Sequence, residues 1–230
     1  MFDVLFSKYD RLVLFDTETT GLDFARDEII EFAAIVVESQ GVVQEYDELI
    51  TLSPGNSVPD FITNLTGISN EDLLQRGLSK TRVCRDIAQM IQGNTLLLAY
   101  NAHFDLSFLY YMLLRDGDPM ILKGKDKLDL LTVYKDRRAF PHKLCNAIDA
   151  YGLTGKVANS HRAVDDVLAT LEVMKCMEQE KADLEKYINL FGYNPKYGIS
   201  GKPIGTVTYK AQGFRNDNQQ FVVPLYSAQM

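Results

Sequence analysis

The first part of the chain consists of apolar runs separated by turn residues. Leu12–Phe15 is an apolar run that breaks at DTETTG, and Glu28–Glu38 and Val42–Leu52 follow, with Gly41 between them. Short apolar runs bounded by turn residues are typical of buried strands. The pattern predicts three consecutive strands, of which the second and third form a hairpin.

Helical and strand patterns then follow one another. Ser79–Ile91 has apolar residues at helical spacing, with Ser79 or Thr81 as cap, and Thr95–Tyr100 is a further apolar strand. A short strand is expected just before Asp129, and helices are expected over Phe104–Arg115, Asp129–Arg138, Lys143–Tyr151 and Ser160–Asp183. No element is predicted in the polar stretch Ser53–Asn70. A meander followed by strand–helix alternation predicts an α/β fold whose sheet has mixed strand directions.

Residues 184–230 differ in character from the rest of the chain. They are rich in glycine, proline and tyrosine, and they contain an alternating TVTYK segment and a final apolar FVVPLY. We therefore predict one domain over residues 1–183 and an accessory hairpin or docking tail over residues 184–230. A hairpin folded back on the same domain fits this pattern equally well.

Composition narrows the class of protein. Apolar residues make up 46% of the 230 residues and the net charge is −7, which argues against a broad basic surface that coats nucleic acid. Three widely spaced cysteines without a CxxC indicate neither a zinc site nor a disulfide framework, so a reducing cytoplasm is the simplest location. The apolar runs are too short for a membrane span, and charges interrupt the first residues too often for a secretory signal, so no membrane partner is expected.

Acidic residues follow two of the predicted strands. Asp16 and Glu18 are two residues apart at a strand end, so both side chains point to one face, where a hard divalent cation would relieve their repulsion. A solvated strand end with two accidental acids is the alternative. Asp105, in NAHFDLSFL, lies in the first turn of a helix, where an acid can simply complement the helix dipole. The recurrence of an acid at a second strand edge favours a site, whereas Asp129 is interpreted as a helix cap.

A third cluster lies in SHRAVDDVLAT. His161 and Asp166 are five residues apart, which on one helix would separate them by about 140°. We therefore place His161 in the loop or at the helix start and Asp166 one turn inside, with Asp165 pointing about 100° away from Asp166. A histidine at the edge of an acidic metal site suits a general base, while a surface histidine beside a helix cap is the alternative.

Together these segments resemble the DEDDh, or DnaQ-like, family of 3′→5′ exonucleases, which includes the proofreading subunits and domains of bacterial replicative polymerases. FDTETTG, NAHFDLSFL and HRAVDD match its three motifs in order, and TGI at Thr66–Ile68 is similar to a segment between the first two. The resemblance covers roughly Arg11–Met177 and is specific because all three motifs are intact. It implies a ribonuclease-H-like fold with a central five-stranded mixed sheet flanked by helices.

The resemblance also implies a two-metal hydrolysis of phosphodiester bonds with Mg²⁺ or Mn²⁺. Asp16 would bridge the metals, Glu18 and Asp166 would complete one site, and Asp105 would support the second. His161 would deprotonate the attacking water. All five residues are thus predicted to be catalytic, and the four acids are predicted to be metal ligands.

The same family pattern places substrate contacts beside the acids. Thr19, Gly21 and Leu22 are predicted to line the pocket of the terminal nucleotide, with Asn101 and Phe104 beside the second acid. Stacking of bases on apolar and aromatic groups would tolerate any base. Phe104 as a core residue of its helix is the alternative interpretation.

These observations predict an enzyme that removes 5′-mononucleotides from the 3′ end of single-stranded DNA, with proofreading in DNA replication and a polymerase partner as its context. Trimming of RNA 3′ ends is the alternative within the enzyme class, because sugar discrimination depends on pocket shape. A catalytically silent docking module is the alternative from another class. It predicts the loss of an acid or of His161, and none is lost.

Overall fold

A mixed sheet forms the centre of the structure, a computed structural model that describes residues 1–194, 198–199, 208–214 and 220–227. Its strands are β1 (Arg11–Thr19), β2 (Ile29–Glu38), β3 (Gly41–Leu49), β4 (Thr95–Ala99) and β5 (Asp126–Asp129). They lie in the order β3-β2-β1-β4-β5. β2 is antiparallel to both of its neighbours, whereas β1, β4 and β5 run parallel. The predicted meander and mixed α/β sheet are confirmed.

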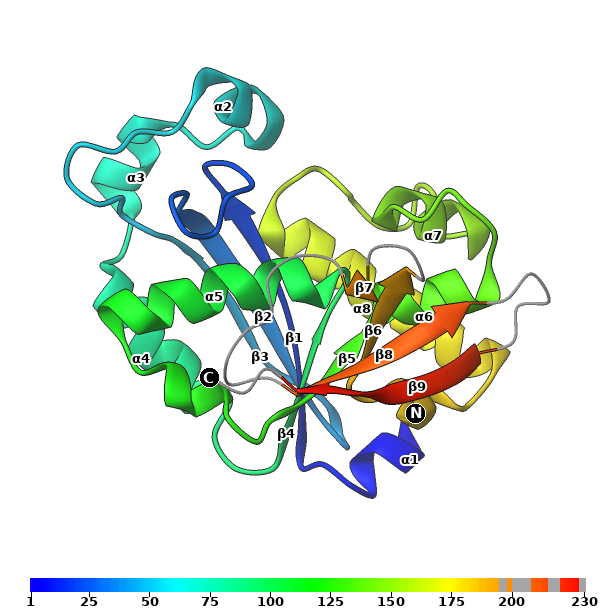
Figure 1. Cartoon of the computed structure of the whole chain (residues 1–230). Helices are drawn as coiled ribbons and strands as arrows, with labels where there is room; N and C mark the ends of the chain where they lie inside the picture. Colours follow the sequence, from blue (N-terminus) through cyan, green and yellow to red (C-terminus); the bar gives the residue numbers. More distant parts are fainter. Residues whose placement is uncertain (195–197, 200–207, 215–219, 228–230) are drawn as a thin grey trace.

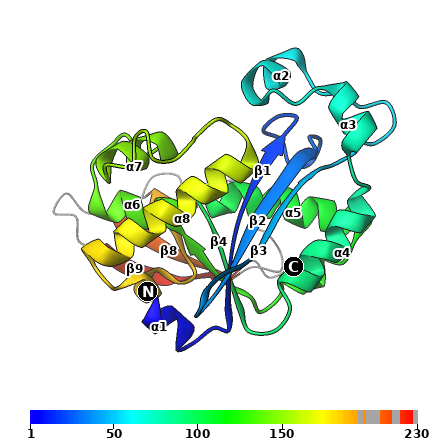
Figure 2. The same ribbon diagram turned by 180° about the vertical axis from the view of Figure 1, so that it is seen from behind.

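Helices cover both faces of this sheet (Figures 1 and 2). One face carries α8, which is in front of the sheet in Figure 2, together with α6, α7 and the short α1; the other carries α4 and α5. Their bounds are α1 (Asp3–Phe6), α4 (Lys80–Met90), α5 (Ala102–Asp116), η1 (Pro119–Leu122), α6 (Leu130–Arg137), α7 (Leu144–Ala150) and α8 (Ala163–Glu180). Ser79 caps α4 by accepting a hydrogen bond from the backbone of Arg82. None of the helices in the described ranges is long and apolar enough to cross a membrane.

The central strands are apolar along their whole length because both of their faces are covered. Leu12 and Leu14 of β1 pack into the first core, under α8, while Val13 and Phe15 pack into the second core, under α5. This division follows the two-residue period of a strand. Burial on both sides therefore explains why β1 appears in the sequence as a continuous apolar run.

An arm of two short helices, α2 (Asp60–Thr66) and α3 (Asn70–Arg76), extends beyond the ends of β1 and β2 (Figure 1). It packs on the sheet through a third small core, in which Ile62 of α2 and Leu73 of α3 join Ile30 of β2 and Leu49 of β3. The prediction of no element in Ser53–Asn70 is therefore wrong over α2. Each helix has seven residues and buries only one or two side chains, so no apolar stripe marks it in the sequence.

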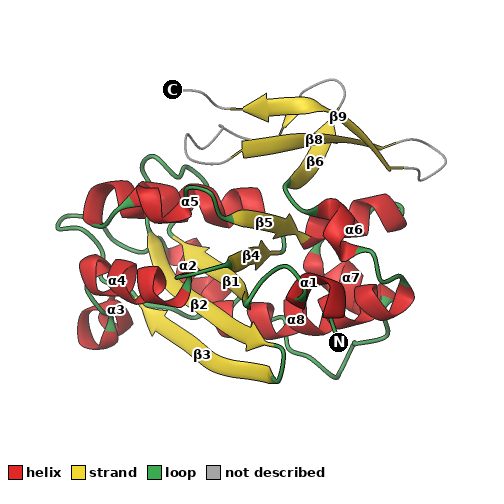
Figure 3. Cartoon of the chain, turned by 90° about the horizontal axis from the view of Figure 1, so that it is seen from below, coloured by secondary structure: helices red, strands yellow, loops and turns green. Residues whose placement is uncertain are grey.

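The chain after α8 first returns to the main domain and then enters a second sheet. Leu184 and Tyr187, in η2 (Leu184–Tyr187), are buried in the first core. The second sheet has the order β7-β6-β8-β9, in which β8 and β9 form an antiparallel pair. Its strands are β6 (Leu190–Asn194), β7 (Gly198–Ile199), β8 (Thr208–Phe214) and β9 (Gln220–Ser227). β6 contacts β5 and α6 (Figure 3), and the domain boundary after residue 183 stays a prediction.

Candidate active site

The candidate site lies where two parallel strands separate. β1 and β4 pair only from Arg11 and Thr95 to Leu14 and Leu98. After that point β4 ends and the chain turns into α5, while β1 continues to Thr19. One edge of β1 is therefore open to polar groups from α5. The carboxyl ends of neighbouring parallel strands, where the chain departs in different directions, are common ligand sites in α/β sheets.

Asp105, in the first turn of α5, bonds to this open edge. Its Oδ1 accepts hydrogen bonds from the backbone N of Thr17 at 3.0 Å and from Thr17 Oγ1 at 2.7 Å. The Asp105 side chain is buried. β1 thus fixes the position of Asp105. Its role therefore goes beyond complementing the dipole of α5.

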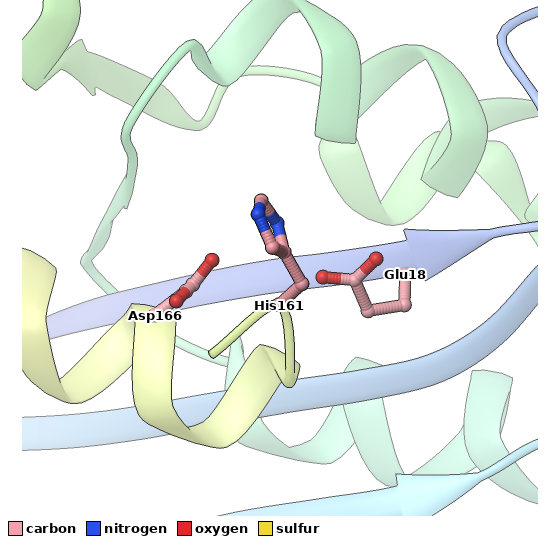
Figure 4. Close-up of side chains that lie close together, drawn as sticks. All are labelled: Glu18, His161 and Asp166. Atoms are coloured by element: carbon pink, nitrogen blue, oxygen red, sulfur yellow. The ribbon is translucent and has the colours of Figure 1, made fainter. Parts of the chain in front are cut away.

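Glu18, His161 and Asp166 converge on the same region from three segments. Each offers one possible ligand atom, and these atoms lie within 4.8 Å of one another. Figure 4 shows Glu18 on β1, Asp166 on α8 and the imidazole of His161 between the two carboxylates. Thr17 is buried whereas Asp16 and Glu18 are partly exposed, as expected if the two acids share one face of β1.

The loop before α8 presents the histidine. His161 is exposed and has a φ of 59°, outside the helix, while Asp166 is buried in the first turn. Asn159 Nδ2 donates to Asp166 Oδ1 at 2.7 Å, and Ser160 donates to Asp165. The prediction that His161 precedes the helix and Asp166 lies inside it is confirmed, and Asp166 rather than Asp165 belongs to the cluster.

The acids of the site raise one another's pKa. Burial raises the pKa of Glu18 to about 8, and the charges of Asp166, Glu31 and Asp105 act in the same direction. Burial, followed by the same neighbours and Glu18, holds the pKa of Asp16 well above its usual range. Burial raises the pKa of Asp105 to about 7, although the hydrogen bonds from β1 lower it, and burial also raises the pKa of Asp166.

This electrostatic pattern fits a cation site. Crowded carboxylates resist ionisation because burial and like charges both penalise the charged form. A hard divalent cation, which prefers oxygen ligands, reverses that penalty. The donor set of four carboxylates with a histidine beside it therefore suits one or more such ions.

Asp129 has the structural role expected of it. It is the N-cap of α6, where its Oδ1 accepts from the backbone of Leu131 at 3.1 Å. The same oxygen accepts from the backbone N of Asn101 at 3.0 Å and of Ala102 at 3.2 Å. Asp129 therefore also holds the start of α5, the helix that carries Asp105.

Three residues that support the acids or the histidine loop were missed in the sequence. Thr17 holds Asp105, Asn159 holds Asp166, and Glu31 of β2 bonds to the residues that follow His161. Glu31 carried a readable signal, since it is the one charge within the apolar run IIEFAAIVV. No sequence pattern marks Thr17 or Asn159, because each donates to an acid that only the fold brings next to it.

The predicted pocket residues after β1 lie in a braced turn. Thr19 Oγ1 donates to the backbone O of Gly21 at 2.6 Å, and Asp27 accepts from the backbone N of Asp23 at 2.8 Å. A Cβ on Gly21 would lie 2.4 Å from a carboxylate oxygen of Asp27, so a larger residue there would displace the Asp27 side chain. Leu22 is 83% exposed at the turn. Contact of these residues with a nucleotide stays a prediction.

The other two predicted pocket residues lie at the start of α5. Asn101 is exposed and has a φ of 74°, and it immediately precedes the helix. Phe104 is partly buried, with its ring centroid 4.9 Å from that of Phe108, and packs against the second core. Phe104 therefore has the packing role of the alternative interpretation, and its contact with substrate stays a prediction.

Comparisons with known proteins agree with this arrangement. Residues 13–174 match the family model RNase_T, which describes exonucleases. The chain is 30% identical over 184 residues to the DNA polymerase III subunit epsilon of Treponema pallidum, which covers 77% of the chain and 81% of that protein. It is also 30% identical over 226 residues to the 3′-5′ exonuclease DinG of Bacillus subtilis, covering 94% of the chain but only 22% of DinG.

A solved structure shows the same fold. Exonuclease I of E. coli in complex with a dA16 oligonucleotide superimposes with a TM-score of 0.67 at 21% identity, over 77% of the chain and 42% of exonuclease I. The chain thus spans less than half of that protein. The likeness confirms the predicted ribonuclease-H-like α/β fold with its five-stranded mixed sheet.

Proposed function

The chain belongs to the exonuclease family, and on that premise we propose that it hydrolyses single-stranded DNA from the 3′ end and releases 5′-mononucleotides. The observation that carries this proposal is the cluster of Glu18, His161 and Asp166, with Asp16 and Asp105 close enough to act on the pKa values of these acids. It is the residue set expected of the DEDDh type. The epsilon subunit of DNA polymerase III and DinG, both similar over most of the chain, support a 3′→5′ direction and DNA as substrate.

Single-stranded DNA is favoured by a solved structure of the same fold and by an exposed apolar side chain near the acids in the sequence. Exonuclease I has been solved with dA16 and dT13 oligonucleotides. In this chain the exposed Leu22 projects from the turn next to the acids, where an apolar side chain can contact a base of any identity. An enzyme that removes nucleotides from a strand of any sequence must hold its substrate without reading base edges, and apolar contact with the base meets this requirement.

We assign Asp16, Glu18, Asp105 and Asp166 as the residues that would hold two divalent cations, Mg²⁺ or Mn²⁺. When bound, the cations would stabilise the charge on the attacking and leaving oxygens of an in-line displacement. Thr17 would keep Asp105 in place, because both of its donors already bond that carboxylate.

His161 would act as the general base. Its imidazole is exposed and lies beside Glu18 and Asp166, where a ring nitrogen can accept a proton from an attacking water. The protein's own contribution to the reaction is thus to hold the acids, expose the base and admit a single strand.

For the biological context we propose proofreading beside a DNA polymerase. Proofreading beside a DNA polymerase is supported by the epsilon subunit and by the polymerases of the PolC type that are similar to the chain. Residues 184–230 are proposed as the docking segment for such a partner. A cytoplasmic location stays a prediction that is compatible with Cys84, Cys145 and Cys176 being free.

The test is the release of nucleotides from a 3′-labelled strand in the presence of Mg²⁺ or Mn²⁺. We expect Asp16→Asn to lower the rate by at least about 10²-fold, because it removes a charge from the centre of the cluster. Asp10→Asn is the matched control, since Asp10 is exposed and precedes the opposite end of β1. Full activity of Asp16→Asn would refute the proposal. In a competition of labelled DNA with labelled RNA, preferential loss of RNA would favour the exoribonuclease alternative.

A further inference from the structure

Glu31 is a buried carboxylate that lies behind the acids of the site. It is 0% exposed, and in the antiparallel pairing of β1 with β2 it stands directly opposite Glu18. Its Oε1 accepts from Arg162 Nε at 2.8 Å and its Oε2 accepts from the backbone N of Ala163 at 2.7 Å. Both oxygens therefore bond to the two residues that follow His161.

These bonds give Glu31 a role different from that of the neighbouring acids. Both of its oxygens are occupied by protein donors, so Glu31 is not set up as a ligand for a cation. A buried carboxylate needs such partners, because an unpaired buried charge is costly. Its bond to Ala163 also satisfies one of the free backbone N–H groups at the start of α8, where a negative charge is favourable.

The histidine itself depends on its flanking residues for its orientation. His161 has the left-handed backbone conformation, with φ of 59°, which a residue other than glycine adopts only when its surroundings enforce it. On the preceding side, Asn159 bonds to Asp166 and Ser160 bonds to Asp165. On the following side, the bonds are those made by Glu31. The imidazole is exposed, so packing does not orient it.

We infer that Glu31 is a positioning residue that sets the orientation of His161 by anchoring Arg162 and Ala163 to β2. It links the strand next to β1 with the loop that carries the base, so the base and the acids are held at a fixed separation. This inference rests on the proposed function, because it assumes that His161 takes part in the reaction.

The experiment measures kcat, KM and the half-saturating Mn²⁺ concentration of Glu31→Gln on a single-stranded oligonucleotide. Glutamine keeps the size of the side chain but cannot accept from both donors with its two terminal atoms. We expect kcat to fall about 10- to 100-fold, as for a base displaced by about 1 Å, with KM and Mn²⁺ dependence changed less than about threefold. Glu38→Gln is the control, since Glu38 is also on β2 and accepts from Arg11 Nε at 2.9 Å far from the site.

The decisive comparison repeats Glu31→Gln in the His161→Ala background. If Glu31 acts through His161, the second substitution should then cost less than about threefold, because the two effects are coupled. An equal loss in both backgrounds would overturn the inference and leave a general structural role. A full rate of Glu31→Gln beside a slow His161→Ala would overturn it too, whereas a full rate of His161→Ala would refute the base of the proposed function instead.

A second variant covers the case in which Glu31→Gln fails to fold, as judged by its thermal melt. Arg162→Leu removes one of the two anchors and leaves the bond from Ala163 to Glu31. We expect a loss in kcat of about three- to tenfold with His161 present and no further loss in the His161→Ala background. Equal losses in the two backgrounds would contradict the role assigned to Glu31.

Discussion

Two glutamates near the ends of β1 and β2, Glu28 buried and Glu18 partly buried, have opposite electrostatic surroundings. Glu28 accepts from Lys80 Nζ at 2.6 Å and from Ser53 and Asn56, and although burial opposes it, the bonds from Lys80 and Ser53 lower its pKa to about 2. Glu18 has acids for neighbours, and its pKa is raised to about 8. The first carboxylate joins the loop after β3 and the start of α4 to the sheet. The second opposes folding until something neutralises it. Burial alone thus does not determine what an acid does; its partners do.

The largest effect is expected when the ion pair between Lys80 and Glu28 is removed. Lys80→Met leaves Glu28 buried without its cation, which should lower the free energy of unfolding by about 3–5 kcal/mol. The measurement is urea unfolding at pH 7. Arg26→Met, which removes an exposed ion pair with Asp23, should change the stability little. Similar small losses in both variants would show that the Glu28 pair is not important for stability.

The second prediction concerns pH and the cation-free protein in EDTA. Because the folded-state pKa of Glu18 is raised from 4.5 to about 8, its contribution to stability is present below pH 4.5 and lost as the pH rises to about 8. The contribution of Glu28, whose pKa is lowered to about 2, is present above pH 4.5 and lost as the pH falls toward 2.

We therefore expect the free energy of unfolding in EDTA to fall by on the order of 2 kcal/mol between pH 5 and 8. Saturating Mg²⁺ should reduce this slope, because the ion binds the ionised acids of the folded state. Asp16→Asn should also reduce it in EDTA, by removing one of the crowded charges. A flat profile of the wild type in EDTA would be incompatible with the electrostatics of the site.

The smallest effect tests how the strand holds an acid. Thr17→Val keeps the shape of the side chain and the backbone bond to Asp105 but removes the hydroxyl bond. We expect a loss of about 1 kcal/mol in stability at pH 8, and a smaller loss at pH 5, where Asp105, with a pKa of about 7, is protonated. Thr154→Val, which removes a surface bond to Asp149, is the control and should change little. Equal losses at both pH values would contradict the assignment.

The sequence predicted the parts of the molecule that depend on local pattern. The continuous apolar run of β1 and the offset between His161 and Asp166 follow from residue spacing, and the structure confirms them. For the cap of α4 the sequence offered Ser79 or Thr81, and the structure has Ser79. The arm was missed because two-turn helices with one or two buried residues leave no periodic stripe. A capping box at Ser69 and Asp72 was the available signal for α3.

The support of the acids could not be predicted in the same way. Thr17 and Asp105 are 88 residues apart in the chain, and Glu31 and Ala163 are 132 apart. Such bonds depend on which strands are neighbours and on where their pairing stops. The spacing of residues within one segment predicts neither. Motif order therefore identified the acids, but the residues that hold them became visible only in three dimensions.

The early end of the β1–β4 pairing has a consequence for how this fold tolerates change. The acids occupy a gap that the two hydrophobic cores do not need, and their raised pKa values show that folding gains nothing from their charge there. Replacing Asp16 or Glu18 by a neutral residue would therefore be structurally silent or even stabilising. The scaffold could persist as a binding module after such a substitution, so the presence of these two acids reflects a demand other than folding.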